Sequence, residues 1–391
     1  MYQQYFRQTL ADLRAAGLER SLRVMESAPG ARIRMDGREL VLMASNDYLG
    51  LANHPHVRRA ATAAIDAFGV GAGAARLISG HTPLHAELER HLAAFKGTEA
   101  ALVFSSGYSA NLGLLSCLLP ENGLILIDRL SHASLIDGAF LSRRTFRTYP
   151  HRDCGRVERL LAARPARQPA LIATDGVFSM DGDLAPLPEL AHLAERYDAL
   201  LLVDDAHATG VLGTHGRGSL EHFGLAADRI IQMGTLGKAL GGFGAFVAGS
   251  RDLVAFLLHR CRPFIFTTAL PPAMAAAADA ALAIVTQEPQ RRRRLADNRV
   301  YLANGLRTLG FPVAADPTPI VPLILGEAAA ATQFAARLLA AAVFSPAIRP
   351  PTVPRGRARV RLSITSEHTR ADLDQALAAI TQAAAGGAIL A

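Results

Sequence analysis

Lysine is scarce in this sequence. Of the 41 lysines and arginines in the chain, two are lysines, Lys96 and Lys238, and the other 39 are arginines. Arginine therefore serves nearly every position that needs a positive charge. Lys238 stands in the glycine-rich run GTLGKALGGFGAF, and we expect it to lose its proton and attack a carbonyl, which a guanidinium does not do. Lys96, in AAFKGTEA, has no comparable surroundings and is expected to be a lysine left by chance.

Cysteines and long apolar runs are also scarce. Cys117, Cys154 and Cys261 stand at no paired or metal-ligand spacing, so we expect neither a disulfide framework nor a metal site, and a reducing compartment is favoured. The N-terminal segment alternates charged and apolar residues at helical spacing without the apolar core of a signal peptide. The run ALPPAMAAAADAALAIVT is broken by two prolines and Asp279 and does not read as a membrane span. We therefore expect a cytoplasmic protein with no membrane partner.

The positive charge of the chain raises the possibility of a nucleic-acid partner. The net charge is +7 and the isoelectric point is near 9.7, which is typical of proteins that bind nucleic acids. The arginines are scattered, however, and the one dense cluster, residues 291–294, lies inside a helical pattern. No helix-turn-helix or zinc module precedes the globular part. We therefore expect no nucleic-acid partner, whereas a basic surface would suit an acidic substrate or an acidic carrier protein.

The pattern along the chain predicts an α/β protein. A chain of 391 residues is long for one core, so more than one domain is expected. Residues 1–48 read as an N-terminal helix and extended segment. In residues 49–283 apolar strand-like runs alternate with helices, which predicts a large domain with a mostly parallel central sheet covered on both faces. Residues 284–391 predict a smaller α+β C-terminal domain, in which ARVRLSI alternates like an antiparallel strand with one wet face.

Polar side chains follow several of the strand-like runs, where parallel sheets bind ligands. LLVDDAHATG places Asp204 and His207 just past a buried strand. A buried carboxylate is costly unless it meets a cation, and the protonated ring nitrogen of pyridoxal phosphate is such a cation, because the pairing keeps the ring an electron sink. A helix N-cap or a satisfied core pair would explain Asp204 equally well. A metal site would need a third ligand, which the sequence does not supply.

Four further segments add candidate groups. VFSSGYSANLG places Gly107 and Tyr108 where a strand turns into a helix, so that free amides face an anion such as a phosphate; a serine-capped turn would look the same. Thr235 offers a hydroxyl to the same phosphate, or forms a turn. His132, in DRLSHASLIDG, has a flat ring that could stack on a cofactor or share a proton, although lone histidines are more often structural. Ser179, in TDGVFSMDGD, offers a hydroxyl near the cofactor.

Six motifs in fixed order resemble those of the α-oxoamine synthases. These are pyridoxal 5'-phosphate enzymes of the aspartate aminotransferase fold (fold type I), and the likeness runs from about Arg20 to the last helix. The resemblance implies that fold, the cofactor pyridoxal 5'-phosphate, and a homodimer with active sites at the subunit interface. The motifs are SNDYLGL, SSGYSANLG, RLSHASLIDG, DGVFSMDGDLAPL, VDDAHATGVLG and GTLGKALGGFG.

The segment AIRPPTVPRGRARVRLSIT most resembles one branch of that family. This branch condenses a pimeloyl thioester with L-alanine in biotin biosynthesis; the sequence does not tell whether the thioester is carried on coenzyme A or on a carrier protein. Other branches, such as glycine C-acetyltransferase or 5-aminolevulinate synthase, are alternatives. A regulator that senses the cofactor and binds DNA is an alternative from another class. Ala74 and Ala75 replace the usual glycine- and serine-rich turn, which leaves the acyl-chain channel undetermined.

The resemblance also implies roles for individual residues. Lys238 would hold the cofactor as an imine and then remove the alanine α-proton, with a pKa lowered by burial. Arg349 would grip the substrate carboxylate, because its planar fork binds two oxygens at once. The expected catalytic residues are Lys238, His132, Asp204 and His207. The expected cofactor contacts are Gly107, Tyr108 and Thr235, chiefly at the phosphate, with His132 stacked on the ring, Ser179 beside it, Asp204 on the ring nitrogen, His207 on the ring oxygen and Lys238. The expected substrate contacts are Arg20, Asn46, His132, Arg349 and Thr352.

Overall fold

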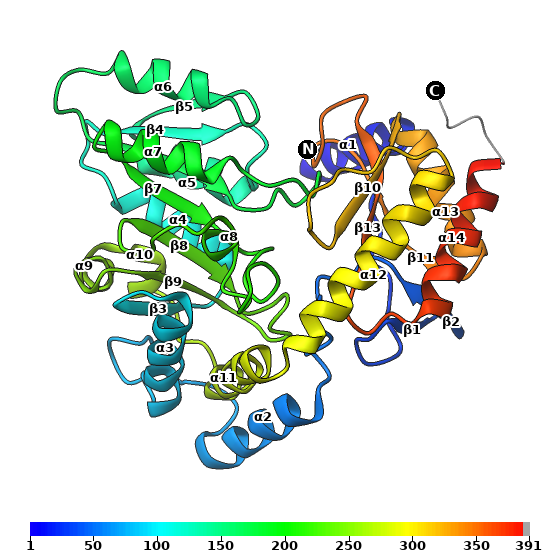
Figure 1. Cartoon of the computed structure of the whole chain (residues 1–391), viewed down its shortest axis with the longest axis horizontal. Coiled ribbons are helices and arrows are strands. Elements are labelled where there is room, and N and C mark those ends of the chain that lie inside the picture. Colours follow the sequence, from blue (N-terminus) through cyan, green and yellow to red (C-terminus); the bar gives the residue numbers. More distant parts are fainter. Residues whose placement is uncertain (386–391) are drawn as a thin grey trace. The chain divides into compact units, whose positions relative to one another are not determined.

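The computed structural model describes residues 1–385 (Figure 1). The chain divides into two compact units. The smaller unit comprises Met1–Gly50, Met180–Gly182 and the described residues from Arg293 onward, and the larger unit comprises Leu51–Ser179 and Asp183–Arg292. The division at residues 48 and 283 that the sequence suggests stays a prediction about independent domains.

A seven-stranded sheet forms the centre of the larger unit, with the strand order β3-β9-β8-β7-β6-β4-β5. The neighbours from β8 to β5 are parallel, and β9 is antiparallel to both β8 and β3. This mostly parallel sheet confirms the predicted fold class. The strands are β3 (Ala100–Phe104), β4 (Leu124–Asp128), β5 (Thr145–Tyr149), β6 (Ala170–Asp175), β7 (Leu200–Asp204), β8 (Ile230–Thr235) and β9 (Ala245–Gly249).

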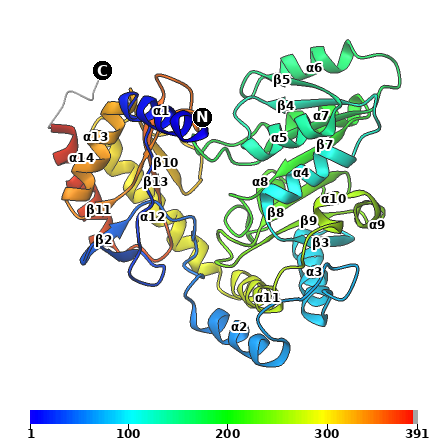
Figure 2. The same ribbon diagram turned by 180° about the vertical axis from the view of Figure 1, so that it is seen from behind.

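The apolar runs form strands because helices cover both faces of this sheet. In β4, Ile125 and Ile127 pack into one core cluster, whereas Leu124 and Leu126 pack into the other. Helix α7 lies over the face seen in Figure 1, and α4 lies over the opposite face seen in Figure 2. The helices of the larger unit are α2 (Pro55–Phe68), α3 (Pro83–Lys96), α4 (Gly107–Cys117), α5 (Ala133–Ser142), α6 (Cys154–Ala162), α7 (Leu187–Arg196), α8 (Ser219–Phe223), α9 (Arg251–Arg260), α10 (Arg262–Ile265) and α11 (Pro272–Gln287).

Two small sheets organise the smaller unit. One has the order β10-β13-β12 and is antiparallel, and the other has the order β1-β2-β11. The strands are β1 (Arg32–Met35), β2 (Arg38–Leu42), β10 (Ile320–Gly326), β11 (Val343–Phe344), β12 (Ala347–Ile348) and β13 (Ala358–Ser363). The helices are α1 (Tyr2–Ala15), α12 (Pro289–Thr308, in this unit from Arg293), α13 (Ala328–Ala340) and α14 (Arg370–Ala385). None of the helices within residues 1–385 is long and apolar enough to cross a membrane.

Strand β13 is antiparallel as predicted, but the prediction that one of its faces is exposed to solvent is wrong. Arg359 is 1% exposed although it alternates with apolar residues. Its Nη1 donates to Oδ1 of Asp181 at 2.7 Å and to the backbone oxygen of Met180 at 2.9 Å. A buried guanidinium is tolerated because these acceptors replace water, and alternation of arginine with valine and leucine does not reveal such acceptors.

Candidate active site

The candidate site lies in the larger unit, where three parallel strands end. Strands β6, β7 and β8 end in Asp175, Asp204 and Thr235. The β6–β7 register pairs Asp175 with Asp204. The chain segments after β7 and β8 then supply His207 and Lys238.

Lys238 and His207 contact each other directly. The Nζ atom of Lys238 lies 2.8 Å from Nε2 of His207, so the amine and the imidazole share a hydrogen bond. The turn that presents Lys238 closes through hydrogen bonds from the N–H of Gly241 to the oxygen of Lys238 and from the N–H of Gly242 to that of Leu236. Gly241 has a φ of +64°, and a Cβ there would come 2.3 Å from the backbone nitrogen of Ala52. The glycines around the lysine therefore follow from a tight turn against neighbouring backbone.

Asp204 is a buried carboxylate with strong donors, 4% exposed. Its Oδ2 accepts a hydrogen bond from Nδ2 of Asn111 at 2.7 Å, and its Oδ1 accepts one from the N–H of Ala206 at 3.0 Å. Asn111 lies on α4 and also donates to the hydroxyl of Ser134 at 2.9 Å. Asn111 was not predicted. Its position, four residues after Gly107 and among apolar helix residues, is the one signal in the sequence that could have marked it.

His132 caps α5, and its imidazole Nδ1 lies 2.7 Å from the hydroxyl of Ser134. Its backbone N–H donates to Oδ2 of Asp175 at 2.9 Å. Burial lowers the pKa of the imidazole; Asp204 opposes this effect, and the charge of Lys238 adds to it. The ring is therefore neutral near pH 7, which suits a flat surface for an aromatic ligand. Ser134 and Asp175 were missed because their contacts to His132 depend on the fold.

The N-terminus of α4 has the geometry of an anion site. Ser106 is the N-cap and accepts a hydrogen bond from the N–H of Ser109 at 3.1 Å. Gly107 and Tyr108 are the first two helical residues, and N–H groups at these positions have no acceptor within a helix. The hydroxyl of Tyr108 donates to the carboxylate of Asp137. Both the cap and the amide cluster are therefore present, so the two interpretations of this motif are compatible.

Thr235 and Ser179 are two predicted cofactor contacts that carry side-chain hydroxyls, and the hydrogen bonds of Thr235 lie within its own turn. The hydroxyl of Thr235 donates to the backbone oxygen of Gly244 at 3.0 Å and accepts from the N–H of Gly237 at 3.2 Å, so it stabilises the lysine turn whatever else it binds. Ser179 is half-buried and is the last residue of the larger unit before Met180. The roles of both residues toward a cofactor stay predictions.

The donor set fits pyridoxal 5'-phosphate. An amine for the aldehyde carbon, a buried carboxylate for the pyridine nitrogen and helix-start amides for the phosphate are the three groups that this molecule requires. A metal centre on Asp204 and His207 would need a third ligand, and among residues 1–385 no three histidine, cysteine, aspartate or glutamate side chains cluster as metal ligands.

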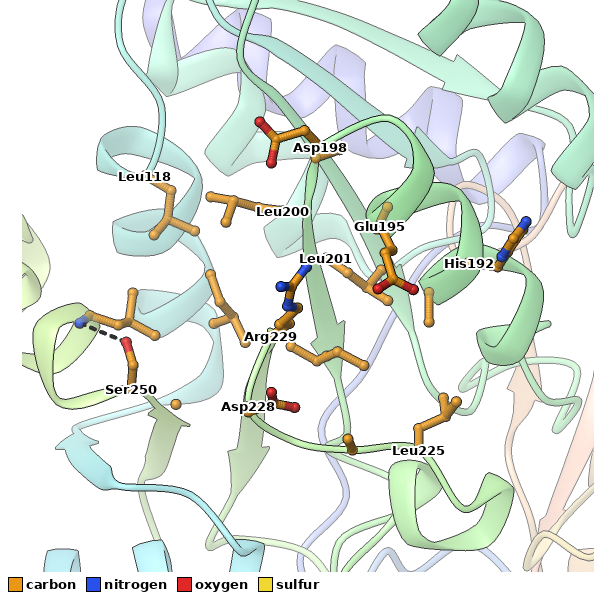
Figure 3. Close-up of a pocket in the computed structure, with 18 of the residues that line it drawn as sticks. Leu118, His192, Glu195, Asp198, Leu200, Leu201, Leu225, Asp228, Arg229 and Ser250 are labelled. Carbon is orange, nitrogen blue, oxygen red and sulfur yellow. Dashed lines mark hydrogen bonds between the residues drawn. The ribbon is translucent and has the colours of Figure 1, made fainter.

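A cavity elsewhere in the larger unit does not coincide with this site. It has a volume of about 1030 Å³ and is lined by Leu200, Leu201 and Ile230, at the amino ends of β7 and β8, with Asp198 and Arg229 beside them (Figure 3). The chemistry-bearing side chains stand at the other ends of these strands. The site is therefore defined by its side chains and not by the cavity.

Two of the predicted substrate residues meet in the smaller unit. Nη2 of Arg20 lies 3.5 Å from the hydroxyl oxygen of Thr352. Arg349 donates to the backbone oxygens of Gly17 and Glu19, the latter at 3.0 Å. These contacts gather three of the five predicted substrate residues, Arg20, Arg349 and Thr352, around the segment of residues 17–20.

Asn46, another predicted substrate residue of the smaller unit, has different partners. Its Oδ1 accepts from Nη2 of Arg361 at 2.9 Å and from the hydroxyl of Tyr48 at 3.2 Å. Arg361 is a missed candidate, because its place in an alternating strand made it look like a solvated charge. The substrate contacts of these four residues and of His132 stay predictions.

Comparison with known proteins places these features in a family context. The model of the family "Aminotransferase class I and II" matches residues 38–380. The 8-amino-7-oxononanoate synthase of Geobacter sulfurreducens is 52% identical over 375 residues, which cover 95% of this chain and 96% of that protein. That of Thermoanaerobacter pseudethanolicus is 48% identical over 376 residues, 96% of this chain and 95% of that protein.

Solved structures agree with the sequence relatives. Serine palmitoyltransferase from S. paucimobilis with a bound PLP-myriocin aldimine has a TM-score of 0.93 and 31% identity, with 97% of each chain covered. The 8-amino-7-oxononanoate synthase from Francisella tularensis has a TM-score of 0.76 and 29% identity, with 88% of this chain and 97% of that chain covered.

Proposed function

Because the chain belongs to the class I and II aminotransferase family, we propose that it condenses L-alanine with a pimeloyl thioester to give 8-amino-7-oxononanoate, carbon dioxide and the free thiol. It is a pyridoxal 5'-phosphate-dependent acyltransferase of biotin biosynthesis. The observation that carries this assignment is identity of 47 to 52% to 8-amino-7-oxononanoate synthases over almost the whole length of both chains.

The residues at the strand ends would hold the cofactor. Lys238 would bind its aldehyde carbon, Asp204 its ring nitrogen, His207 its ring oxygen and His132 the face of its ring. The first amides of α4, with Thr235, would bind its phosphate, and Ser179 would lie beside the ring. When bound, the cofactor supplies an electron sink for the negative charge that develops at the α-carbon of alanine.

The hydrogen bonds of Asp204 support its proposed role at the ring nitrogen of the cofactor. A carboxylate that accepts hydrogen bonds from an amide side chain and a backbone N–H is fixed in orientation. Asn111 and Ala206 provide these two donors. An oriented anion at this point would keep a ring nitrogen protonated.

The pair of Lys238 and His207 supports proton transfer. At 2.8 Å the amine and the imidazole can pass a proton between them. This contact supports the proposal that Lys238 is the general base for the α-proton of alanine. Gly237 and Ala239 flank Lys238, so the two residues next to it in the chain carry no bulky side chain.

Substrate recognition is proposed for the smaller unit. Arg349 would bind the carboxylate of the amino acid, and Arg20, Asn46 and Thr352 would contact substrate near it. The acyl donor is a pimeloyl thioester of coenzyme A or of a carrier protein, and both carriers are acidic, which suits the net charge of +7. We also propose a homodimer in the cytoplasm, where the three free thiols would remain reduced.

The test is a substrate comparison with the purified protein. L-alanine, glycine and L-serine are each supplied with pimeloyl-CoA, a pimeloyl carrier protein and acetyl-CoA, and thiol release is followed. We expect alanine with a pimeloyl donor to exceed the other pairs by about 10²-fold in kcat/KM. Fastest turnover of glycine with acetyl-CoA would instead assign glycine C-acetyltransferase activity. A protein without visible absorbance that shifts DNA in a gel would favour the regulator.

A further inference from the structure

Two carboxyl groups stand next to each other at the site, although the proposed reaction uses one. Asp175 ends β6 and Asp204 ends β7, and the parallel register makes them direct neighbours. They are 3% and 4% exposed. Register partners in a parallel pair point to the same face of the sheet, so both carboxyl groups belong to one buried cluster.

The two groups have different partners. Asp204 accepts from the amide of Asn111 and the N–H of Ala206, and it is the group proposed for the ring nitrogen. Asp175 accepts the N–H of His132 at 2.9 Å. His132 is the N-cap of α5, so Asp175 fixes the backbone from which the His132 ring projects.

The charges around Asp175 disfavour a second anion. Burial raises the pKa of Asp175 well above its ordinary value, and the charge of Asp204 raises it further; the His132 N–H, the Ser131 hydroxyl and Lys238 oppose this. The other titratable groups that face it are His132, whose pKa is lowered by burial, and Tyr149, whose pKa is raised by burial. Asp128 contributes another negative charge beside Tyr149. Adjacent buried carboxyl groups share one proton more readily than they both ionise.

We propose that Asp175 is a positioning residue that works as a neutral carboxylic acid, holding the N–H of His132 while leaving Asp204 as the anion that faces the cofactor. This inference rests on the proposed function, which supplies the cofactor. It goes beyond that function by giving Asp175 a protonation state and a role in positioning His132.

Matched substitutions on the two neighbouring strands test the proposal. Asp175→Asn keeps an oxygen for the His132 N–H and carries no charge, so kcat and the visible absorbance of the bound cofactor should stay within about threefold of the unmodified protein. Asp204→Asn should lower kcat by about 10²-fold or more. Asp175→Ala removes the acceptor, and cofactor affinity should fall about tenfold because the His132 backbone loses its anchor.

The outcomes separate the possibilities. If Asp175→Asn is as impaired as Asp204→Asn while its melting temperature is unchanged, Asp175 works as an anion and the proposal is wrong. If Asp175→Ala binds cofactor as tightly as the unmodified protein, Asp175 does not position His132, and the proposal is again wrong.

A second measurement uses the full-length chain without cofactor and needs no activity. Because the pKa of Asp175 is higher folded than unfolded, the folded protein keeps a proton that the unfolded chain releases, so the free energy of unfolding falls as pH rises above about 4. The Asp175→Asn variant has no ionisable group at this position, so this decrease in the free energy of unfolding is absent. Its melting temperature should therefore exceed that of the unmodified chain by an increasing margin, about 2–4 °C or more by pH 7. A margin that does not grow with pH overturns the proposal even if the synthase assay has failed for another reason.

Discussion

Lys96 and Asp205 form an ion pair in which both side chains are fully buried, with 2.9 Å between Nζ and Oδ2. Nζ also donates to the backbone oxygen of Arg217, and Asp205 accepts from the N–H and the hydroxyl of Ser219. The expectation that Lys96 is a lysine left by chance is therefore wrong. Both lysines of the chain occupy places where a compact ammonium contacts specific groups. Since Asp205 directly follows Asp204, the pair also ties down the segment that begins at the proposed site.

Replacing Lys96 with methionine should destabilise the protein strongly. The apolar side chain fills the space, but Asp205 is left as a buried carboxylate without its cation, at a cost of about 3–5 kcal/mol. Urea denaturation followed by circular dichroism measures the change. The double variant Lys96→Met with Asp205→Asn removes both charges and should recover part of the loss. A single variant as stable as the unmodified protein would show that Asp205 finds another partner.

Lys238→Arg should abolish the visible absorbance of the cofactor bond. A guanidinium keeps its proton at neutral pH and does not form that bond, so turnover should fall by about 10³-fold or more while the melting temperature of the cofactor-free chain changes little. Absorbance spectra with and without L-alanine check this. Persistence of the colour in the purified variant would remove Lys238 from its proposed role.

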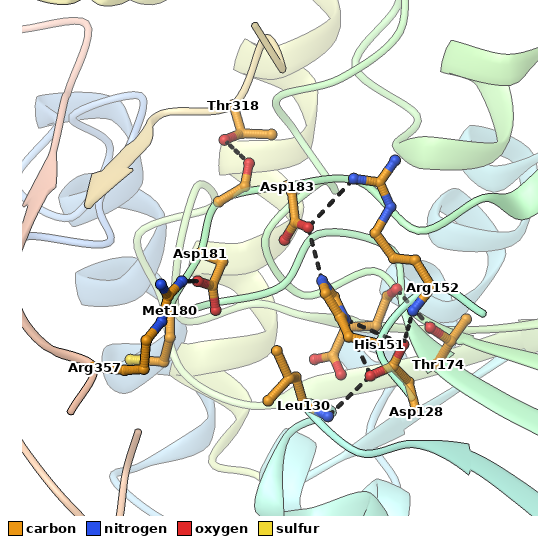
Figure 4. Close-up of polar contacts among 12 residues, drawn as sticks. Asp128, Leu130, His151, Arg152, Thr174, Met180, Asp181, Asp183, Thr318 and Arg357 are labelled. Atoms are coloured by element: carbon orange, nitrogen blue, oxygen red, sulfur yellow. Dashed lines mark hydrogen bonds and ion pairs between the residues drawn. The ribbon is translucent and has the colours of Figure 1, made fainter. Parts of the chain in front are cut away.

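The pH dependence of stability should report His151. This histidine bridges two carboxylates, with Nδ1 3.1 Å from Oδ1 of Asp128 and Nε2 2.8 Å from Oδ2 of Asp183 (Figure 4). Burial alone would lower its pKa, but the hydrogen bonds to Asp128 and Asp183 raise the pKa to about 9. The stability that the cation contributes is complete below about pH 6.5, the unfolded value. It is lost as pH rises through about 9.

His151→Asn should therefore flatten the decline of the melting temperature between pH 6.5 and 9. The variant should also be less stable at pH 6, where the histidine is charged, and nearer to the unmodified protein at pH 9.5. His56→Asn, at an exposed histidine, serves as the control and should keep the original slope. An unchanged slope in His151→Asn would mean that other groups produce the pH dependence.

The sequence revealed the fold, the family and the cofactor because each leaves a local pattern. Buried parallel strands read as apolar runs, and the polar residues just past their ends marked Asp204, His207 and Lys238. Asn111 and Asp175 were not predicted as site residues. Asn111 contacts Asp204, 93 positions away, and Asp175 contacts His132, 43 positions away, and no local sequence pattern encodes such contacts. Arg359 was misjudged for the same reason, since its acceptors come from a turn about 180 residues earlier. The roles of the individual site residues stay predictions.

Arg349→Lys should weaken recognition of the amino acid without unfolding the protein. The guanidinium of Arg349 donates to the backbone oxygens of Gly17 and Glu19, which orients its planar fork, and a fork is what holds both oxygens of a carboxylate. A lysine keeps the positive charge, but its ammonium group lacks the two parallel donors that hold both carboxylate oxygens. We therefore expect KM for L-alanine to rise about 10- to 100-fold, with a smaller loss of kcat and a melting temperature within about 2 °C.

Titration of the cofactor absorbance with L-alanine measures this affinity apart from turnover. Arg355→Lys, at an exposed arginine six residues further on, is the matched control, because it makes the same arginine-to-lysine substitution away from the contacts to Gly17 and Glu19. Its titration should match that of the unmodified protein. If Arg349→Lys binds alanine normally but loses affinity for the pimeloyl thioester, Arg349 serves the acyl donor. If neither affinity changes, the contacts to Gly17 and Glu19 are its whole function, and the carboxylate must be bound elsewhere.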